Sequence, residues 1–125
     1  MLVFNELNLI GSAIQGGNMQ VFINTDRHIE RTADLVERVE AIAQKELKHQ
    51  AQQLTRVEYH LSDINSETRA GATDKRCLVE GRVAGLKPVT AEHHSEDIQQ
   101  AILEATRQLV RGLEKVISKS QNHRA

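Results

Sequence analysis

Aromatic side chains are scarce in this sequence, which contains only Phe4, Phe22 and Tyr59 among its 125 residues. Proteins that bind single-stranded nucleic acid commonly stack bases on aromatic rings, so this scarcity argues against that mode of binding. The single cysteine, Cys77, cannot form a disulfide within the chain, and every apolar run is shorter than the roughly 18 residues that a membrane span needs. We therefore expect a protein of the reducing cytoplasm that does not cross a membrane.

An excess of charge of one sign is also lacking. The chain carries 16 Lys and Arg against 17 Asp and Glu, a formal net charge of −1. Such a chain is not expected to bind DNA or other polyanions in a general way, although basic residues can still gather locally. The hydrophobic share of 39% is enough for one domain with an aliphatic core, and the length is too short to promise two domains.

The first 18 residues differ from the rest and are predicted to be an N-terminal extension. Their larger apolar residues include Leu2, Val3, Phe4, Leu7, Leu9 and Ile10. The segment has no basic residue at its start, so it does not look like a secretory signal. It ends near the Gly16-Gly17 pair, which predicts a flexible joint. Three interpretations stay open: a packed extension, a short partner-binding segment, and either disorder or sequence upstream of a natural start at Met19.

Periodicity predicts four strands and two helices after residue 18. The strands are indicated by β-branched residues and period-two alternation, at residues 19–25, 54–64, 75–83 and 87–93. The helices are indicated by apolar residues at three-and-four spacing, at residues 32–50 and 95–119. Thr32 is predicted to cap the first helix. The polar stretch 65–74 is predicted to be a loop, and residues 120–125 a frayed tail.

The order β-α-β-β-β-α predicts a single α+β domain over residues 19–119, a four-stranded sheet with both helices packed on one face. In the last helix a further apolar row widens the buried arc, at Leu103, Val110 and Ile117. We expect this row to meet the first helix, with a homodimer seam as the alternative. Gly112 weakens the helix unless it allows close approach to the first helix or the sheet.

Basic residues form the most suggestive pattern for binding. Arg107, Arg111 and Lys115 fall opposite the apolar side of the last helix, and Lys119 lies a little further round. On the first helix the basic residues recur every seven positions, at Arg31, Arg38 and Lys45. Two nearly parallel stripes with a groove between them could follow a phosphate backbone. Solvated helix faces, balanced by nearby glutamates, are the alternative interpretation.

No motif for catalysis or for a cofactor is evident. Glu92, His93 and His94 are the only cluster that resembles metal ligands, but adjacent histidines on a strand point to opposite faces. Cys77 lies in an apolar strand, where a thiol is usually an inert core residue. We therefore expect no enzyme, no metal and no cofactor.

Several short motifs follow one another in a recognisable order and spacing. They are the opening MQVFI, Thr32-x-x-Leu35, Val89-x-Ala91, Asp97-x-x-x-Ala101-Ile102 and Leu109-x-Arg111-x-Leu113-x-Lys115-x-x-x-Lys119. With the element order, they resemble the ribosome hibernation promoting factors, also called ribosome-associated inhibitor or sigma-54 modulation proteins. The resemblance spans residues 19 to about 119. It implies a fold similar to the double-stranded-RNA-binding domain.

The resemblance also implies a function. Members of that family bind the small ribosomal subunit where mRNA and tRNA would bind, so the chain resembles a translation inhibitor that acts in stationary phase or stress. The implied partner is the 16S rRNA of that subunit, rather than DNA or a membrane. Arg111, Lys115 and Lys119 match basic positions on the family's last helix, and Lys45 matches one on its first. The expected RNA-binding residues are Arg38, Lys45, Arg107, Arg111, Lys115 and Lys119.

A second hypothesis stays open beside the first. Some basic positions of the family are apolar here, as at Ile42 and Ile117. The same fold could then serve as a protein-interaction or regulatory module that has lost ribosome binding. The chain ends without the second, dimerising domain of the family's long forms, so a short form is expected.

Overall fold

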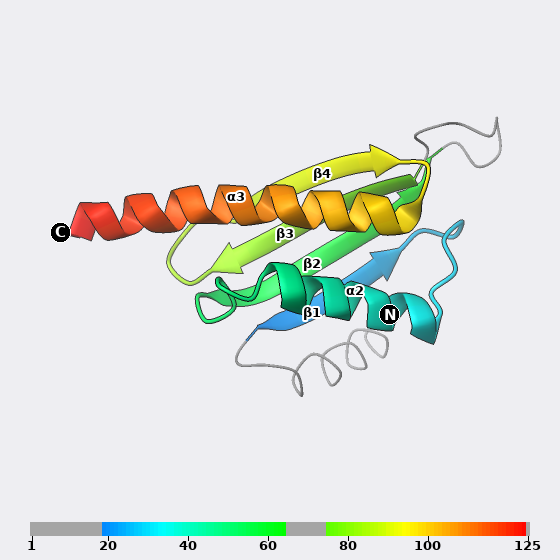
Figure 1. Cartoon of the computed structure of the whole chain (residues 1–125), viewed down its shortest axis with the longest axis horizontal. Helices are drawn as coiled ribbons and strands as arrows, with labels where there is room; N and C mark the ends of the chain where they lie inside the picture. The colour runs from blue at the N-terminus through cyan, green and yellow to red at the C-terminus, as the bar shows by residue number, and fades with distance from the viewer. Residues whose placement is uncertain (1–18, 65–74, 125) are drawn as a thin grey trace.

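The computed structural model describes residues 19–64 and 75–124, and side chains as far as residue 121. Its elements follow one another as predicted and make one four-stranded sheet with two helices (Figure 1). They are β1 (Gln20–Thr25), α2 (Ala33–Glu46), β2 (Leu54–Asp63), β3 (Lys75–Val83), β4 (Val89–Ser95) and α3 (Ile98–Arg124). The predicted α+β class and element order are confirmed.

The sheet has the strand order β1-β2-β3-β4. β1 and β2 are parallel, with Val21 opposite Val57, and α2 forms the crossover between them. β2, β3 and β4 form an antiparallel meander. Both helices lie over the same face, α2 beside β1 and α3 across β3 and β4 (Figure 1). Within the described residues, the other face of the sheet carries no helix.

Alternation along the strands decides which face is covered. Val57, Tyr59 and Leu61 of β2 are buried beneath the helices, whereas Glu58 and His60 between them are half-buried on the outer face. The helices complete the core with small and aliphatic residues, chiefly Leu35, Val39, Ala43, Leu47, Ala101, Ile102, Ala105, Leu109 and Leu113. The only large aromatic residue in this core, within the described residues, is Tyr59.

The first helix is shorter than predicted. Thr32 caps it as expected, since its Oγ1 accepts a hydrogen bond from the backbone N–H of Leu35 at 3.0 Å. The predicted end near Gln50 is wrong, because the helix stops at Glu46. Residues 47–53 form turns instead, closed by backbone hydrogen bonds from Gln50 to Leu47 and from Leu54 to Gln50.

The C-terminal boundaries also differ from the prediction. β4 runs from Val89 to Ser95 rather than over residues 87–93, so Pro88 lies just before it. α3 continues to Arg124, past the predicted end at Lys119, so residues 120–124 of the predicted tail are helical. Residues 120–124 are all polar or charged and give no hydrophobic signal, which is why periodicity missed this turn. The predicted N-terminal extension and the 65–74 loop lie outside the described residues.

Candidate nucleic-acid interface

Two contacts with β4 define one side of α3, which we call the β4 flank. The side-chain Nε2 of Gln108 lies 3.2 Å from Nδ1 of His93, and a Cβ added to Gly112 would lie 2.9 Å from Cγ1 of Val89. Seven residues make about two helical turns. Lys115 and Lys119 therefore stand on the β4 flank, seven positions after Gln108 and Gly112, and both are exposed.

The opposite side of α3 faces α2, and Arg107 belongs to it. The Nε of Arg107 lies 3.3 Å from Oε1 of Glu46 at the end of α2, and its Nη1 lies 3.7 Å from Glu104. Arg107 thus links the two helices through an exposed ion pair. Arg111 lies between Arg107 and the β4 flank, on the exposed face of α3.

The basic residues of the first helix do not form the predicted stripe. Arg31 precedes the helix, and its Nε donates to the backbone oxygen of Ile23 in β1. Arg38 pairs with Asp34 one turn earlier, at 3.0 Å. Lys45 is exposed in the last turn.

The groove predicted between two nearly parallel basic stripes stays a prediction, but its α2 side is incomplete because Arg31 precedes the helix. α2 ends level with Arg107, and the C-terminal half of α3 extends past it (Figure 1). Glu46 occupies the junction where the groove was expected, while Lys115 and Lys119 turn toward β4. What the structure does bring together is one row on the projecting half of α3: Arg111, Lys115 and Lys119.

This row, which we call the α3 basic row, is free to bind an external anion. All three residues are exposed, and within the described residues no carboxylate forms an ion pair with any of them. Lys45 shares both properties but stands alone on α2. Of the six residues predicted to bind RNA, Arg38 and Arg107 form ion pairs with acidic neighbours.

Charges on the outer face of the sheet are largely matched with one another. Arg56 lies 3.6 Å from Glu58 and 4.5 Å above the ring of Phe22, and Arg82 lies 3.6 Å from Glu80. Further along, Arg76 pairs with Glu92. The hydrogen bonds that Arg76 and His94 make to Glu92 hold the pKa of this carboxyl below its usual range. The outer face is thus a mixed-charge surface rather than a basic one.

The residues considered for metal binding or nucleophilic chemistry are dispersed. His93 faces α3 through Gln108, whereas His94 lies on the outer face, 3.0 Å from Glu92. Among the described residues, no group of three potential ligands could hold a metal ion. Cys77 is buried, and burial raises its pKa to about 12, so its thiol is not a ready nucleophile.

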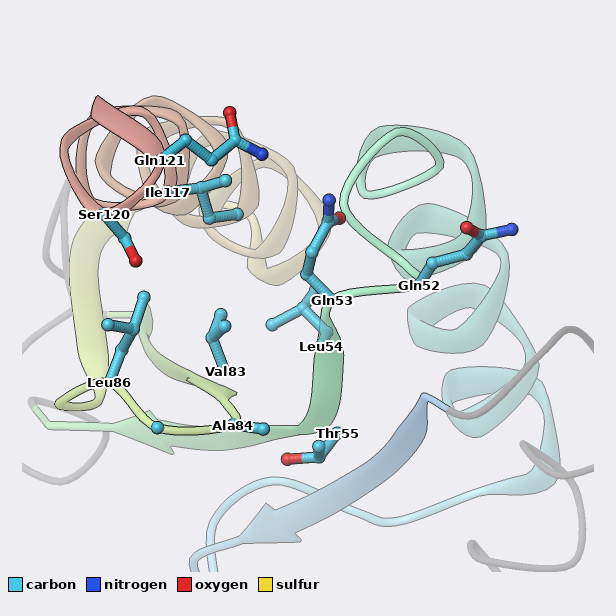
Figure 2. A pocket seen from close by; sticks show the side chains of 11 residues that line it. Gln52, Gln53, Leu54, Thr55, Val83, Ala84, Leu86, Ile117, Ser120 and Gln121 are labelled. Carbon is cyan, nitrogen blue, oxygen red and sulfur yellow. The ribbon is translucent and has the colours of Figure 1, made fainter. Parts of the chain in front are cut away.

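A cavity of about 380 Å³ lies beneath the projecting half of α3, and the sequence analysis missed it (Figure 2). Leu54, Val83, Leu86 and Ile117 supply its apolar walls. Ile117 could have indicated the cavity, because the sequence places this apolar residue outside the arc of the last helix that is needed to cover the sheet. The turns that complete the walls come from distant parts of the chain, so periodicity within one element could not reveal them.

Fold and surface together define a class: a small α+β domain whose last helix carries an exposed basic row. Comparison with known sequences then gives the family. The profile of the family described as sigma 54 modulation protein / S30EA ribosomal protein matches residues 22–121, so the chain belongs to that family. The family resemblance predicted from the sequence is confirmed. Among curated proteins, no sequence matches the chain significantly.

Solved structures show the same fold at low sequence identity. The N-terminal domain of Protein Y from Thermus thermophilus superposes with a TM-score of 0.60 at 20% identity, covering 79% of this chain and 98% of that one. A ribosomal subunit interface protein from Coxiella burnetii gives a TM-score of 0.59 at 15% identity, covering 78% of this chain and 97% of that one. Neither helix of the described residues is long and apolar enough to span a bilayer.

Proposed function

We propose that this protein binds the ribosome in the cytoplasm and inhibits translation in stationary phase or stress. Its partner is the small subunit, and the α3 basic row contacts phosphates of the 16S rRNA. The proposal rests on membership of the S30EA family and on structural neighbours that include a ribosomal subunit interface protein. In this proposal the protein inhibits translation by occupying its binding site on the small subunit, without a catalytic step.

The α3 basic row is the observation that carries the RNA contact. Its three side chains recur every four residues, so they rise along about two turns of one helix and could track successive phosphates. They have no carboxylate partner in the described residues, so binding RNA breaks no ion pair. Lys45 is the fourth contact that we propose, whereas Arg38 and Arg107 must first leave Asp34 and Glu46.

Changing the α3 basic row to alanine tests this proposal. The triple variant Arg111→Ala, Lys115→Ala, Lys119→Ala should bind small subunits roughly tenfold more weakly or worse, because three phosphate contacts are lost. Each exposed substitution should change the free energy of unfolding by less than about 0.5 kcal/mol. Co-sedimentation with purified small subunits measures binding, and thermal melting checks the fold.

A matched control separates specific contacts from net charge. Arg27, Lys48 and Arg82 are also exposed but lie outside α3, and changing them to alanine removes the same charge. We expect the control variant to keep most of the binding. Equal binding by the α3 variant and the natural protein would eliminate the proposed RNA contact.

A protein-interaction module on the same fold is the second candidate. The uncharged cavity beneath α3 and the formal net charge of −1 favour it. It predicts a protein assembly, of which a homodimer is one form, that does not co-sediment with ribosomal subunits. The formation of this assembly should be insensitive to salt. Sucrose-gradient sedimentation of stationary-phase extract distinguishes the two candidates.

A further inference from the structure

The cavity beneath α3 has walls from three separate parts of the chain. They are the turn before β2, the β3–β4 turn and the last turns of α3 (Figure 2). Its apolar side chains are the four aliphatic ones named above and Ala84, and its remaining side chains are neutral amides and hydroxyls, from Gln52, Gln53, Thr55, Ser120 and Gln121. Within the described residues, no charged side chain lines it. Ser120 points toward Leu86 across the opening (Figure 2).

A second hollow extends this cavity along the underside of α3. It measures about 180 Å³ and shares Gln53, Ile117 and Gln121 with the first. It continues between the turn after α2 and the helix, past His49 and Glu114. The two hollows form one shallow groove around Ile117, which we call the α3 groove.

We propose that the N-terminal segment of the same chain occupies the α3 groove, with Leu7, Leu9 and Ile10 against its apolar walls. Residues 1–18 contain one charged residue, Glu6, and are otherwise apolar or neutral. The uncharged stretch from Leu7 to Ile10 matches the larger cavity of the groove, which has aliphatic walls and no charged lining residue, because burial of such surfaces requires no charge to lose its water. The segment precedes residue 22, where the match to the family begins.

The chain brings this segment to the groove at short range. Gln20 pairs with Arg56 in the parallel register, so Met19 lies beside Thr55, which lines the cavity. Met19 is itself buried in the core. The cavity lies over the ends of β2 and β3, about 5 to 10 Å from β1 at the usual strand spacing. The nine residue steps from Met19 back to Ile10 can span up to about 30 Å.

RNA fits the α3 groove less well than the segment does. Ile117 and Gln121 lie on the opposite side of α3 from Lys119, since two residues correspond to about 200° of helical rotation. A nucleotide whose base entered the groove would place its phosphate away from the α3 basic row. The nearest charge that lines the groove is Glu114, an anion.

Paired cysteines in the full chain test the proposal. Leu9→Cys with Ser120→Cys places one thiol in the segment and one at the groove. The control combines Leu9→Cys with Thr90→Cys, which is exposed on the outer face of β4. The native Cys77 is 0% exposed and does not compete. Mild oxidation followed by intact mass and non-reducing electrophoresis measures disulfide formation within one chain.

We expect the Ser120 pair to close within the chain on the order of tenfold faster than the Thr90 pair, because docking raises the effective thiol concentration. Equal rates for the two pairs overturn the proposal. A predominant disulfide between two chains also overturns it and assigns the groove to the segment of a second copy.

Hydrogen exchange gives an independent measurement that needs no cysteine. In the full chain, Leu9→Asp with Ile10→Asp should speed amide exchange at residues 117–121 by about tenfold, because undocking removes the cover from the projecting end of α3. Exchange in β2 and β3 should stay unchanged. Unaltered exchange at residues 117–121 contradicts docking, whatever the ribosome assay shows.

Discussion

Tyr59 and Thr106 form a fully buried hydrogen-bonded pair between β2 and α3. Their hydroxyl oxygens are 2.8 Å apart, and Thr106 donates in turn to the backbone oxygen of Ile102 at 2.7 Å. Thr106 therefore accepts from Tyr59, whose phenol has no other hydrogen-bond partner among the described residues. Burial raises the pKa of Tyr59, so this phenol stays protonated.

The two sides of this pair should respond unequally to substitution. Thr106→Val leaves the phenol buried without an acceptor and should cost about 1 to 3 kcal/mol of unfolding free energy. Tyr59→Phe leaves Thr106 bonded to Ile102 and should cost only about 0.5 to 1.5 kcal/mol. Denaturant unfolding of both variants and of the double variant measures the difference. Equal costs for the two single variants would contradict the assigned direction of donation.

Glu40 is a residue whose charge the fold disfavours. Burial, and then the nearby carboxylate of Glu37, raise its pKa, and Arg31 offsets only part of this. The folded state therefore holds this proton more tightly than the unfolded state. Stability falls as the pH rises from the ordinary glutamate pKa through the raised one, and the deficit persists above it.

Glu40→Gln should consequently raise the melting temperature at pH 7. The gain should vanish as the pH falls below the ordinary pKa of glutamate, where both states carry the proton. Melting curves of the natural protein and the variant between pH 3 and 8 provide the measurement. A gain that is constant over this range would show that the buried negative charge of Glu40 is not the cause.

At the scale of the elements, Gly112 determines how closely α3 approaches β4. Any Cβ at this position meets Val89, so Gly112→Ala should lack the usual gain of about 0.5 to 1 kcal/mol for replacing a helical glycine. Gly112→Leu should cost about 1 to 3 kcal/mol through overpacking. Unfolding free energies of both variants test this.

The same substitution in a Val89→Ala variant makes this test specific to the contact with β4. When Val89→Ala removes the opposing methyl groups, Gly112→Ala should recover its normal gain in helix stability. If Gly112→Ala stabilises the natural protein just as much, contact with β4 does not explain the glycine.

The elements were largely predictable because their signals are local. Alternation gave β2 and β3 nearly to the residue, and Thr32 marked the start of α2. The sheet packing of Gly112 was one of two predicted alternatives, and the structure selects it over contact with α2. Boundaries failed where polar residues continue an element, as at the end of α3.

The candidate interface was less predictable because it depends on contacts between elements. The sequence identified Arg107 and Arg111 as neighbours on one helix face. It could not show that Glu46, from another helix, would engage Arg107, while Arg111 has no carboxylate partner in the part of the chain that the structure describes. The cavity around Ile117 escaped prediction for the same reason, since its walls meet only in the folded chain.

For the whole molecule, the formal net charge is only −1, so a steep salt dependence of binding would indicate a local cluster of basic residues rather than overall charge. If the α3 basic row and Lys45 make four phosphate contacts, the logarithm of the affinity should fall with the logarithm of salt concentration at a slope of about −3 to −4, by analogy with DNA. Small-subunit binding between 50 and 200 mM salt measures this slope. The triple alanine variant should retain a slope near about −1. A flat response in the natural protein favours the protein-interaction module.

The parallel pairing of β1 with β2 separates the order of synthesis from the order of assembly. β1 leaves the ribosome first, but its partner in the sheet is made only after α2. α3, which covers β3 and β4, is made after all four strands, so the core closes only once α3 has emerged. A nascent chain therefore lacks the helix that carries Arg111, Lys115 and Lys119. On the proposed function, the chain becomes competent to bind a ribosome only once α3 has emerged and packed on the sheet.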